Sequence, residues 1–307
     1  MATEPIPATA VPPADVLDLF AVPEDPRPLE GGQGHSFVAG DLVLSPGRDA
    51  ATCAWLNPVL ARLAVELDTR APRGLRIAMP IPSRDGRWVV DGWGASRYEP
   101  HTRPCQDIDV LVATGRLLHA RLASALPSPP DAIRDRTDRW ARAERATFDA
   151  TGATDATDAT DATDATDATD AEGAASVASQ PPGIPLRYAG RLVADLVGRL
   201  DDTDLGPDQL VHADLAGNVL LDARGVPVVI DVAPYWRPAL WAEAVCVLDA
   251  VLWHGADPSV MAHWGHGARR QAMLRAGLFR LLSDDPAEPA LTRYRALLLD
   301  SPATSGH

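Results

Sequence analysis

The segment Leu210-Val-His-Ala-Asp-Leu-Ala-Gly-Asn-Val-Leu-Leu-Asp-Ala-Arg-Gly-Val-Pro-Val-Val-Ile-Asp231 contains two apolar runs separated by a polar turn. The runs at 219–221 and 228–230 predict two short strands, and Arg224-Gly225 predicts the turn of a hairpin. With the turn centred there, the numbers of paired residues add to 449, so we expect Asn218 opposite Asp231. Opposed residues lie about 4.5–5.5 Å apart at Cβ. The two side chains should therefore share one end of the hairpin.

The polar residues of this segment are of the types that phosphoryl transfer needs. The amide of Asn218 and the carboxylate of Asp231 suit Mg²⁺, which takes few protein ligands and completes its shell with phosphate and water. Asp214 enters the same corner on a loop, where it would orient an acceptor hydroxyl and take its proton. We interpret His212 as a loop support that hydrogen-bonds neighbouring backbone and holds Asp214 in place. The alternative is a surface loop whose acids only cap neighbouring elements.

The rest of the chain changes character near residue 100. Before it, a helical pattern at 50–67 and a turn at 83–86 accompany strand-like runs at 36–38, 42–44, 76–79 and 87–90. After it, helical patterns follow at 108–125, 134–149, 186–201, 238–255 and 266–282. We expect an α+β fold with an N-terminal extension (1–25), a small β-rich lobe (26–100) and a larger, mainly helical lobe (101–307).

A three-residue repeat interrupts the helical part. Ala153-Thr-Asp recurs six times up to Asp170, and a period of three fits neither a helix stripe nor a strand. Such residues cannot bury enough apolar area to offset the entropy of ordering, so residues 150–183 are predicted to be a disordered insertion. The segment 151–172 has six Asp, one Glu and no basic residue, which is half of the net charge of −14. An acidic segment that recruits a partner is the alternative.

Composition narrows the class of protein. The chain of 307 residues is 46% hydrophobic, without an apolar run long enough for a membrane helix or an N-terminal secretion signal. Its three cysteines are widely spaced, which favours free thiols in the cytoplasm. The remaining charge forms no basic stripe, so neither nucleic acid nor membrane is expected as a partner. We interpret His254, His263 and His266 as surface histidines and not as a zinc site.

The motif His212-x-Asp214 with Asn218, followed by the hairpin and Ile230-Asp231, resembles the aminoglycoside phosphotransferase family. Three further segments resemble an actinobacterial-type branch of that family: Gly31-Gly-Gln-Gly34, Trp88-Val-Val-Asp-Gly-Trp93 and Pro234-Tyr-Trp-Arg-Pro238. The resemblance covers most of the chain and implies a two-lobed, protein-kinase-like fold. It also implies ATP-dependent phosphorylation of a hydroxyl on a small molecule, with ATP and Mg²⁺ as cofactors.

Two other segments are candidates for ligand contacts. The glycine-rich run that supplies Gly31, Gly32, Gly34 and Ser36 would let backbone N–H groups approach a phosphate, although an ordinary hairpin turn has the same composition. The residues Tyr235, Trp236 and Arg237 follow the expected metal ligand Asp231 closely, which makes them candidates for the substrate side.

The sequence departs from the family pattern in two places. Three residues separate Asp214 from Asn218, where the family usually has four, so the loop must turn more tightly, with Gly217 as the flexible position. The chain also has no lysine, since all 28 of its basic residues are arginines. The strand that should carry a phosphate-binding lysine ends in Ser45, and Arg48 is the nearest cation. A catalytically impaired protein that binds nucleotide or metabolite without turnover is therefore the alternative function.

Overall fold

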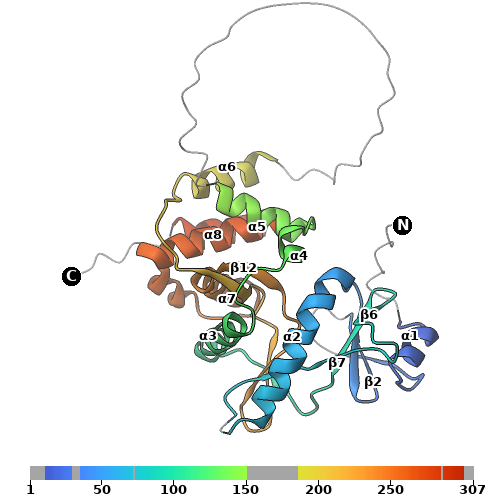
Figure 1. Ribbon diagram of the computed structural model, residues 1–307. Helices are drawn as coiled ribbons and strands as arrows, with labels where there is room; N and C mark the ends of the chain where they lie inside the picture. The colour runs from blue at the N-terminus through green and yellow to red at the C-terminus, as the bar shows by residue number, and fades with distance from the viewer. Residues whose placement is uncertain (1–10, 30–34, 72, 151–185, 285, 301–307) are drawn as a thin grey trace, which may run out of the picture. The chain divides into compact units, whose positions relative to one another are not determined.

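The computed structural model describes residues 11–29, 35–71, 73–150, 186–284 and 286–300 (Figure 1). Two features of the sequence lie outside this part of the chain, namely the predicted phosphate-loop residues Gly31, Gly32 and Gly34 and the repeat within the predicted insertion. The chain divides into two compact units, one of residues 1–136 and 204–273 and the other of residues 137–203 and 274–307. Residues on both sides of position 100 belong to the first unit, so the expected lobe boundary there stays a prediction.

The N-terminal sheet of the first unit has the strand order β1-β2-β3-β7-β5, with β6 paired to β7. Its strands are β1 (Arg27–Pro28), β2 (Phe37–Ala39), β3 (Leu42–Ser45), β5 (Pro80–Ile81), β6 (Val89–Val90) and β7 (Trp93–Arg97). Helix α1 (Ala14–Leu19) lies beside β2 and β6 (Figure 1) and packs Val16 and Leu17 into the same apolar cluster as Trp93. Part of the predicted N-terminal extension is thus packed against this sheet.

A tight hairpin and a separate turn lie between β5 and β7 of this sheet. Asp91 and Gly92 join β6 to β7 with φ values of +47° and +79°, the backbone of a two-residue turn that matches strand twist. The predicted turn at 83–86 also forms, with the Gly86 N–H donating to the Ser83 carbonyl at 2.9 Å. It precedes β6 without joining a strand pair, because both β5 and β6 pair with β7. Asp91-Gly92 is a typical sequence signal for such a hairpin, and this hairpin was not predicted.

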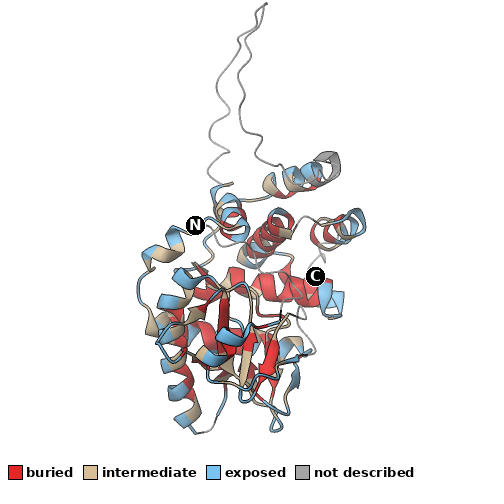
Figure 2. Ribbon diagram, turned by 90° about the vertical axis from the view of Figure 1, so that its right-hand side faces the viewer, coloured by how far each residue is buried: buried red, intermediate tan, exposed pale blue. Residues whose placement is uncertain are grey.

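Helix α2 (Ala50–Thr69) agrees with the predicted helix at 50–67. Asp49 caps it by accepting a hydrogen bond from the Thr52 N–H at 2.7 Å. Its apolar stripe is buried at Leu56, Leu60, Leu63 and Leu67. This stripe belongs to a core that also includes residues of α3 (Ile108–Ala125) and of the 219–229 hairpin. Figure 2 shows the same division, with buried residues on the strands and inner helix faces and exposed residues on loops and outer faces.

Two smaller sheets hold the segment quoted first. One has the order β4-β11-β10-β8, made of β4 (Arg76–Ile77), β11 (Pro227–Val229), β10 (Val219–Leu221) and β8 (Arg103–Pro104). The other is an antiparallel pair of β9 (Asp208–His212) and β12 (Pro234–Pro238), which the sequence analysis did not predict. Helices α3 and α7 (Ala239–Trp253) both pack against β9. In the chain, β9 therefore precedes the predicted hairpin and β12 follows it, and these two strands pair with each other.

The register of the hairpin corrects the prediction. Val219 pairs with Val229, so paired numbers add to 448 and Asn218 lies opposite Ile230 instead of Asp231. The cause is a three-residue loop in place of the expected two-residue turn: the Asp222 carboxylate accepts hydrogen bonds from the backbone of Arg224 and Val226, and Gly225 takes a φ of +78°. The predicted pairing of Asn218 with Asp231 was wrong by one residue.

The other described helices include the predicted ones, with shifted ends, and three that were not predicted. They are α4 (Asp131–Arg134), α5 (Arg139–Asp149), α6 (Leu186–Val197), the 3₁₀ helix η2 (Pro258–Trp264), α8 (Gly267–Asp284) and α9 (Glu288–Leu298), of which α4, η2 and α9 were not predicted. Helix α5 begins later than predicted because Asp138 caps it, accepting from the Ala141 N–H at 3.0 Å. In the second unit, Gly277 makes room for Leu298 of α9, a helix that was not predicted. The α+β class, with strands concentrated early and helices late, is confirmed.

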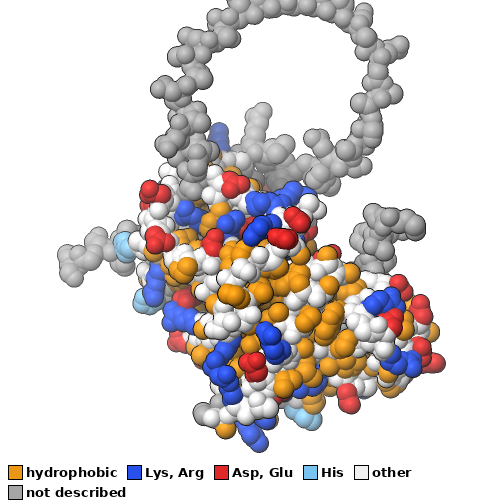
Figure 3. Space-filling model, in the orientation of Figure 1, with side chains coloured by type: hydrophobic (Ala, Val, Ile, Leu, Met, Phe, Trp, Pro, Cys, Tyr) orange, Lys and Arg blue, Asp and Glu red, His pale blue; other side chains and the backbone are white. Residues whose placement is uncertain are grey.

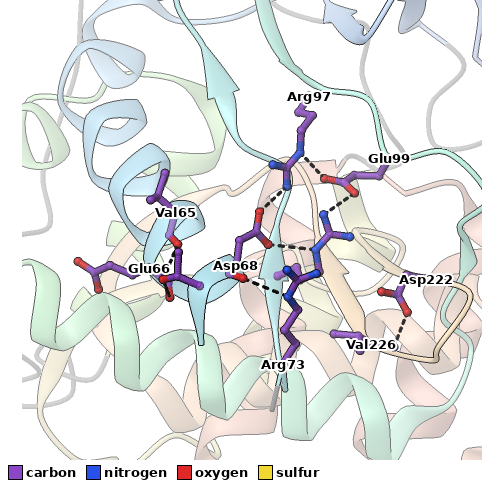
Figure 4. A network of polar contacts seen from close by, with 10 residues as sticks. Val65, Glu66, Asp68, Arg73, Arg97, Glu99, Asp222 and Val226 are labelled. Carbon is purple, nitrogen blue, oxygen red and sulfur yellow. Dashed lines mark hydrogen bonds and ion pairs between the residues drawn. The ribbon is translucent and has the colours of Figure 1, made fainter. Parts of the chain in front are cut away.

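A closed ring of four charged side chains joins α2 to two of the sheets (Figure 4). Asp68 accepts hydrogen bonds from Arg76 at 3.1 Å and from Arg97 at 3.0 Å. Glu99 contacts the same two arginines, each at 2.8 Å. Because Arg76 lies on β4, beside β11, the ring connects the N-terminal sheet with the hairpin that ends in Asp231.

The described surface carries charges of both signs. On the face drawn in Figure 3, apolar side chains gather in the middle, and arginines and acidic side chains lie intermixed around them. Among the helices of the described residues, none combines the length and apolar character needed to cross a bilayer.

Candidate active site

The Asp214–Asn218 loop closes on itself through the side chain of Asn218. The amide nitrogen of Asn218 donates to the Asp214 backbone carbonyl at 2.6 Å and to Asp214 Oδ2 at 3.2 Å. The Asn218 backbone N–H donates to the Leu215 carbonyl at 3.0 Å. These bonds fix the Asp214 carboxylate at the start of β10, so the two polar residues of the motif act as one structural group.

Gly217 makes this short loop possible. Its φ of +85° lies in the left-handed region, which favours glycine. A Cβ atom at this position would lie 2.7 Å from Cε1 of His254, the residue that ends α7. The exposed His254, expected only as a surface histidine, therefore covers the backbone between Asp214 and Asn218.

His212 lies beneath the loop and is fully buried. Its Nδ1 accepts a hydrogen bond from the Ala233 N–H at 3.1 Å, and the Ala213 N–H donates to the Ala233 carbonyl at 3.2 Å. These two bonds tie the residue before Asp214 to a residue two positions beyond Asp231. They bring the two acidic segments of the motif to one corner of the unit.

His119 of α3 is a site residue that the sequence analysis missed. Its Nε2 accepts a hydrogen bond from the His212 backbone N–H at 3.2 Å. Burial, together with the neighbouring His212, lowers the pKa of His119 to about 3, so the ring is neutral at physiological pH. A lone histidine on a helical face gives no sequence signal for this contact, because its partner is 93 residues away in the chain.

Asp231 forms an ion pair with Arg48, which follows β3. The two side chains keep 30% (Arg48) and 48% (Asp231) of their exposure, so the pair is open to ligands. Removal of water by the surrounding protein opposes both charges, but their Coulombic attraction and hydrogen bond outweigh this cost. The pKa of Arg48 is raised and the pKa of Asp231 is lowered. Asp231 also has a φ of +47°, a strained conformation of the kind found at functional sites.

Strand β3, which was expected to carry a lysine, ends in Ser45. Its hydroxyl lies 2.9 Å from the hydroxyl of Ser36, the described member of the predicted phosphate-binding group. The two hydroxyls thus hydrogen-bond across the β2–β3 hairpin. Arg48, three residues after Ser45, brings a positive charge to Asp231.

Asn218 and Asp231 each offer an oxygen of the type that a hard divalent cation prefers, although the hairpin register does not pair the two residues. Asp231 presents a carboxylate that already binds the positive charge of Arg48. The amide nitrogen of Asn218 is turned to Asp214, so its oxygen faces the other way and is the atom suited to a cation. Within the described residues, His, Cys, Asp and Glu side chains form no group of three that could hold a metal. An ion held here would thus need phosphate and water for most of its shell.

The candidate substrate residues Tyr235, Trp236 and Arg237 all lie on β12. Tyr235 is buried, with its ring edge-on to Trp241 at a centroid distance of 5.6 Å and the guanidinium of Arg136 at 5.1 Å. Trp236 and Arg237 are half-buried, and Arg237 lies 3.9 Å from the carboxylate of Asp208. Tyr235 therefore contributes to packing, while Trp236 and Arg237 remain partly exposed to solvent.

Comparison with known proteins gave matches among solved structures alone. No protein-family model and no curated protein sequence matched the chain. Choline kinase LicA from Streptococcus pneumoniae is 13% identical with a TM-score of 0.46, and the match covers 93% of this chain and 96% of that one. An aminoglycoside phosphotransferase from Alicyclobacillus acidocaldarius is 13% identical with a TM-score of 0.47, covering 95% and 84%. A choline/ethanolamine kinase family protein from Mesorhizobium loti is 14% identical with a TM-score of 0.42, covering 92% of each.

One of these three structures is an aminoglycoside phosphotransferase, the family that the sequence motif resembles, and the other two are of the choline kinase type. TM-scores below 0.5 at 13–14% identity carry no functional inference for this chain. The function is therefore inferred from the side chains at the site.

Proposed function

We propose that the chain is a phosphotransferase that moves a phosphoryl group from ATP to a hydroxyl of a small molecule. The observation that carries the proposal is the hydrogen bonding of Asn218 to Asp214, together with the bonds of Ala233 to Ala213 and His212, which hold the segment after Asp231 against the strand before Asp214. Phosphoryl transfer requires mainly positioned charges and a proton acceptor, and this corner supplies both kinds of group.

The side chains of the site have separate tasks in this proposal, and Asn218 has two. The Asp214 carboxylate accepts the hydrogen bond of the acceptor hydroxyl, orients it toward the donor and takes its proton as the new bond forms. Asn218 keeps Asp214 in place through its amide nitrogen. His212 holds the strand before Asp214 against the segment after Asp231. Asn218 and Asp231 would hold Mg²⁺, which supplies charge neutralisation to the donor phosphates.

The test is ADP formation from ATP with a panel of hydroxylated small molecules. Asp214→Asn keeps the size and the hydrogen-bonding reach of the side chain but removes the proton acceptor, so turnover should fall by about 10²–10⁴-fold. Asp109→Asn, at an exposed position in the first turn of α3, is the matched control and should keep wild-type turnover. Equal turnover in wild type and Asp214→Asn would sink the assigned role of Asp214.

A binding protein without turnover is the second candidate. It is favoured by the absence of lysine from the chain and by the ion pair that engages Asp231. It predicts that ADP raises the melting temperature, with or without Mg²⁺, while no acceptor yields product. Nucleotide-induced stabilisation that needs both Mg²⁺ and an intact Asp231, tested with Asp231→Asn, supports the enzyme instead.

A further inference from the structure

Arg48 is held in place by several independent features of the chain. Its backbone N–H donates to the Gly92 carbonyl at 2.9 Å, at the tip of the β6–β7 hairpin. A Cβ atom at Gly94 would lie 3.0 Å from Arg48 Cγ, so this glycine makes space for the stem of the arginine. Gly47, the preceding residue, has a φ of +71°. The turn after β3 thus directs a guanidinium to the carboxylate of Asp231.

The chemistry of the guanidinium suits a second partner at the same corner. One nitrogen of Arg48 donates to Asp231, and a guanidinium has five N–H donors in a planar fork that matches phosphate oxygens. The contact is open to solvent, with 30% of the arginine side chain exposed. In a chain without lysine, the cation beside Asp231 is the group placed to bind donor phosphates.

We propose that Arg48 is the polyphosphate-binding cation of this site, and that Asp231 holds it as an internal counter-ion until nucleotide and divalent cation bind in exchange. This inference rests on the proposed function. In the ligand-free protein, Arg48 neutralises Asp231. When a polyphosphate binds, the guanidinium transfers to the phosphate oxygens and the carboxylate becomes available to the cation. Arg48 therefore assists nucleotide binding and opposes metal binding in the absence of nucleotide.

The predicted effects of Arg48 on nucleotide affinity and on metal affinity have opposite signs. This difference distinguishes the proposed role from a purely structural one. Replacing Arg48 with glutamine removes a charge-assisted hydrogen bond to phosphate, so ADP affinity should fall by at least ~10-fold. The same change frees Asp231, so the affinity for Mn²⁺ without nucleotide should rise by about 3–5-fold, the scale of a partly exposed ion pair. A variant that merely disturbed the fold would lower the affinity for both ADP and Mn²⁺.

The experiment is isothermal titration of ADP in the presence of Mg²⁺, together with Mn²⁺ binding followed by electron paramagnetic resonance without nucleotide. Wild type, Arg48→Gln and Arg48→Lys are compared, because lysine keeps the charge and should recover part of the ADP affinity. Arg62→Gln, an exposed arginine on α2, is the matched control and should leave both affinities unchanged. Thermal unfolding of each variant verifies that it is folded.

The outcomes distinguish this inference from the function on which it rests. A wild type that binds no ADP under any condition overturns the proposed function and the polyphosphate role together. A wild type that binds ADP, with Arg48→Gln binding it equally well, overturns the inference alone. Mn²⁺ affinity that stays constant or falls in Arg48→Gln overturns the counter-ion role of Asp231.

Discussion

At Gly217 the absence of a side chain allows the Asp214–Asn218 loop to close with three intervening residues. The left-handed φ of +85° and the nearby ring of His254 both exclude a Cβ atom. Gly217→Ala should therefore lower the free energy of unfolding by about 1–3 kcal/mol, the usual cost of a strained backbone conformation. Urea denaturation followed by circular dichroism measures this loss.

A double-mutant cycle separates the two causes at this residue. His254→Ala removes the ring that the new methyl group would meet, so it should recover the steric part of the Gly217→Ala loss and leave the backbone part. Strict additivity of the two substitutions would contradict the contact between His254 and the loop.

Residues of the site differ in how far the sequence could predict them. Asp214, Asn218 and Asp231 lie within 18 positions of one another, so the strand pattern predicted the hairpin between Asn218 and Asp231, although its register is shifted by one residue. His119 and Arg48 reach the site from 93 and 183 positions away, by hydrogen bonds that depend on how α3 and β3 pack. Arg48 was noted as the nearest cation, but its pairing with Asp231 required the structure. Distant contacts of this kind leave no local pattern to detect.

Among the larger elements, the ring of Asp68, Arg76, Arg97 and Glu99 is the connection that a single substitution tests best (Figure 4). Glu99→Gln keeps the shape of the side chain but removes the charge that Arg76 and Arg97 share at 2.8 Å. The two guanidiniums then repel each other with one carboxylate between them. We expect a loss of about 1–3 kcal/mol in the free energy of unfolding, below the range for fully buried pairs because Arg97 keeps 29% exposure.

Glu66→Gln is the matched control for the ring, since Glu66 is exposed on the neighbouring turn of α2. It should change the free energy of unfolding by less than about 0.5 kcal/mol. Urea denaturation of both variants makes the comparison, and losses of equal size would contradict a structural role of the ring.

Helices with a clear periodicity of apolar residues were predicted well, whereas strands that depend on pairing with a distant strand were not. Helix α3 matches its prediction at both ends because an apolar stripe and the cap at Asp107 coincide. Strands β9 and β12 were missed, since each is stabilised mainly by the other across 22 positions between His212 and Pro234. The hairpin was predicted but misregistered, because the Asp222 side chain selects a longer loop than Arg224-Gly225 suggests.

On the scale of the whole molecule, the buried His119 makes stability depend on pH. Burial lowers the pKa of this residue to about 3 in the folded protein, while an unfolded chain has an ordinary histidine pKa of about 6.5. Between these values the unfolded state binds the additional proton, so the contribution of His119 to stability is complete above pH ~6.5 and is lost as the pH falls toward 3. The expected slope is about 1.4 kcal/mol per pH unit for one proton.

His119→Gln removes this titration while keeping an oxygen that can accept from the His212 N–H. Urea denaturation between pH 6.5 and 5 avoids most carboxylate titration, so the free energy of unfolding should fall more steeply with acid in wild type than in His119→Gln. The predicted difference in slope is about 1 kcal/mol per pH unit. His263→Gln, an exposed substitution on η2, is the matched control for the replacement of a histidine by glutamine. Parallel profiles for wild type and His119→Gln would mean that the buried ring is protonated in the folded protein. The hydrogen bond from the His212 backbone, which holds the Asp214 segment, would then need another acceptor, because a protonated imidazole has no lone pair to offer.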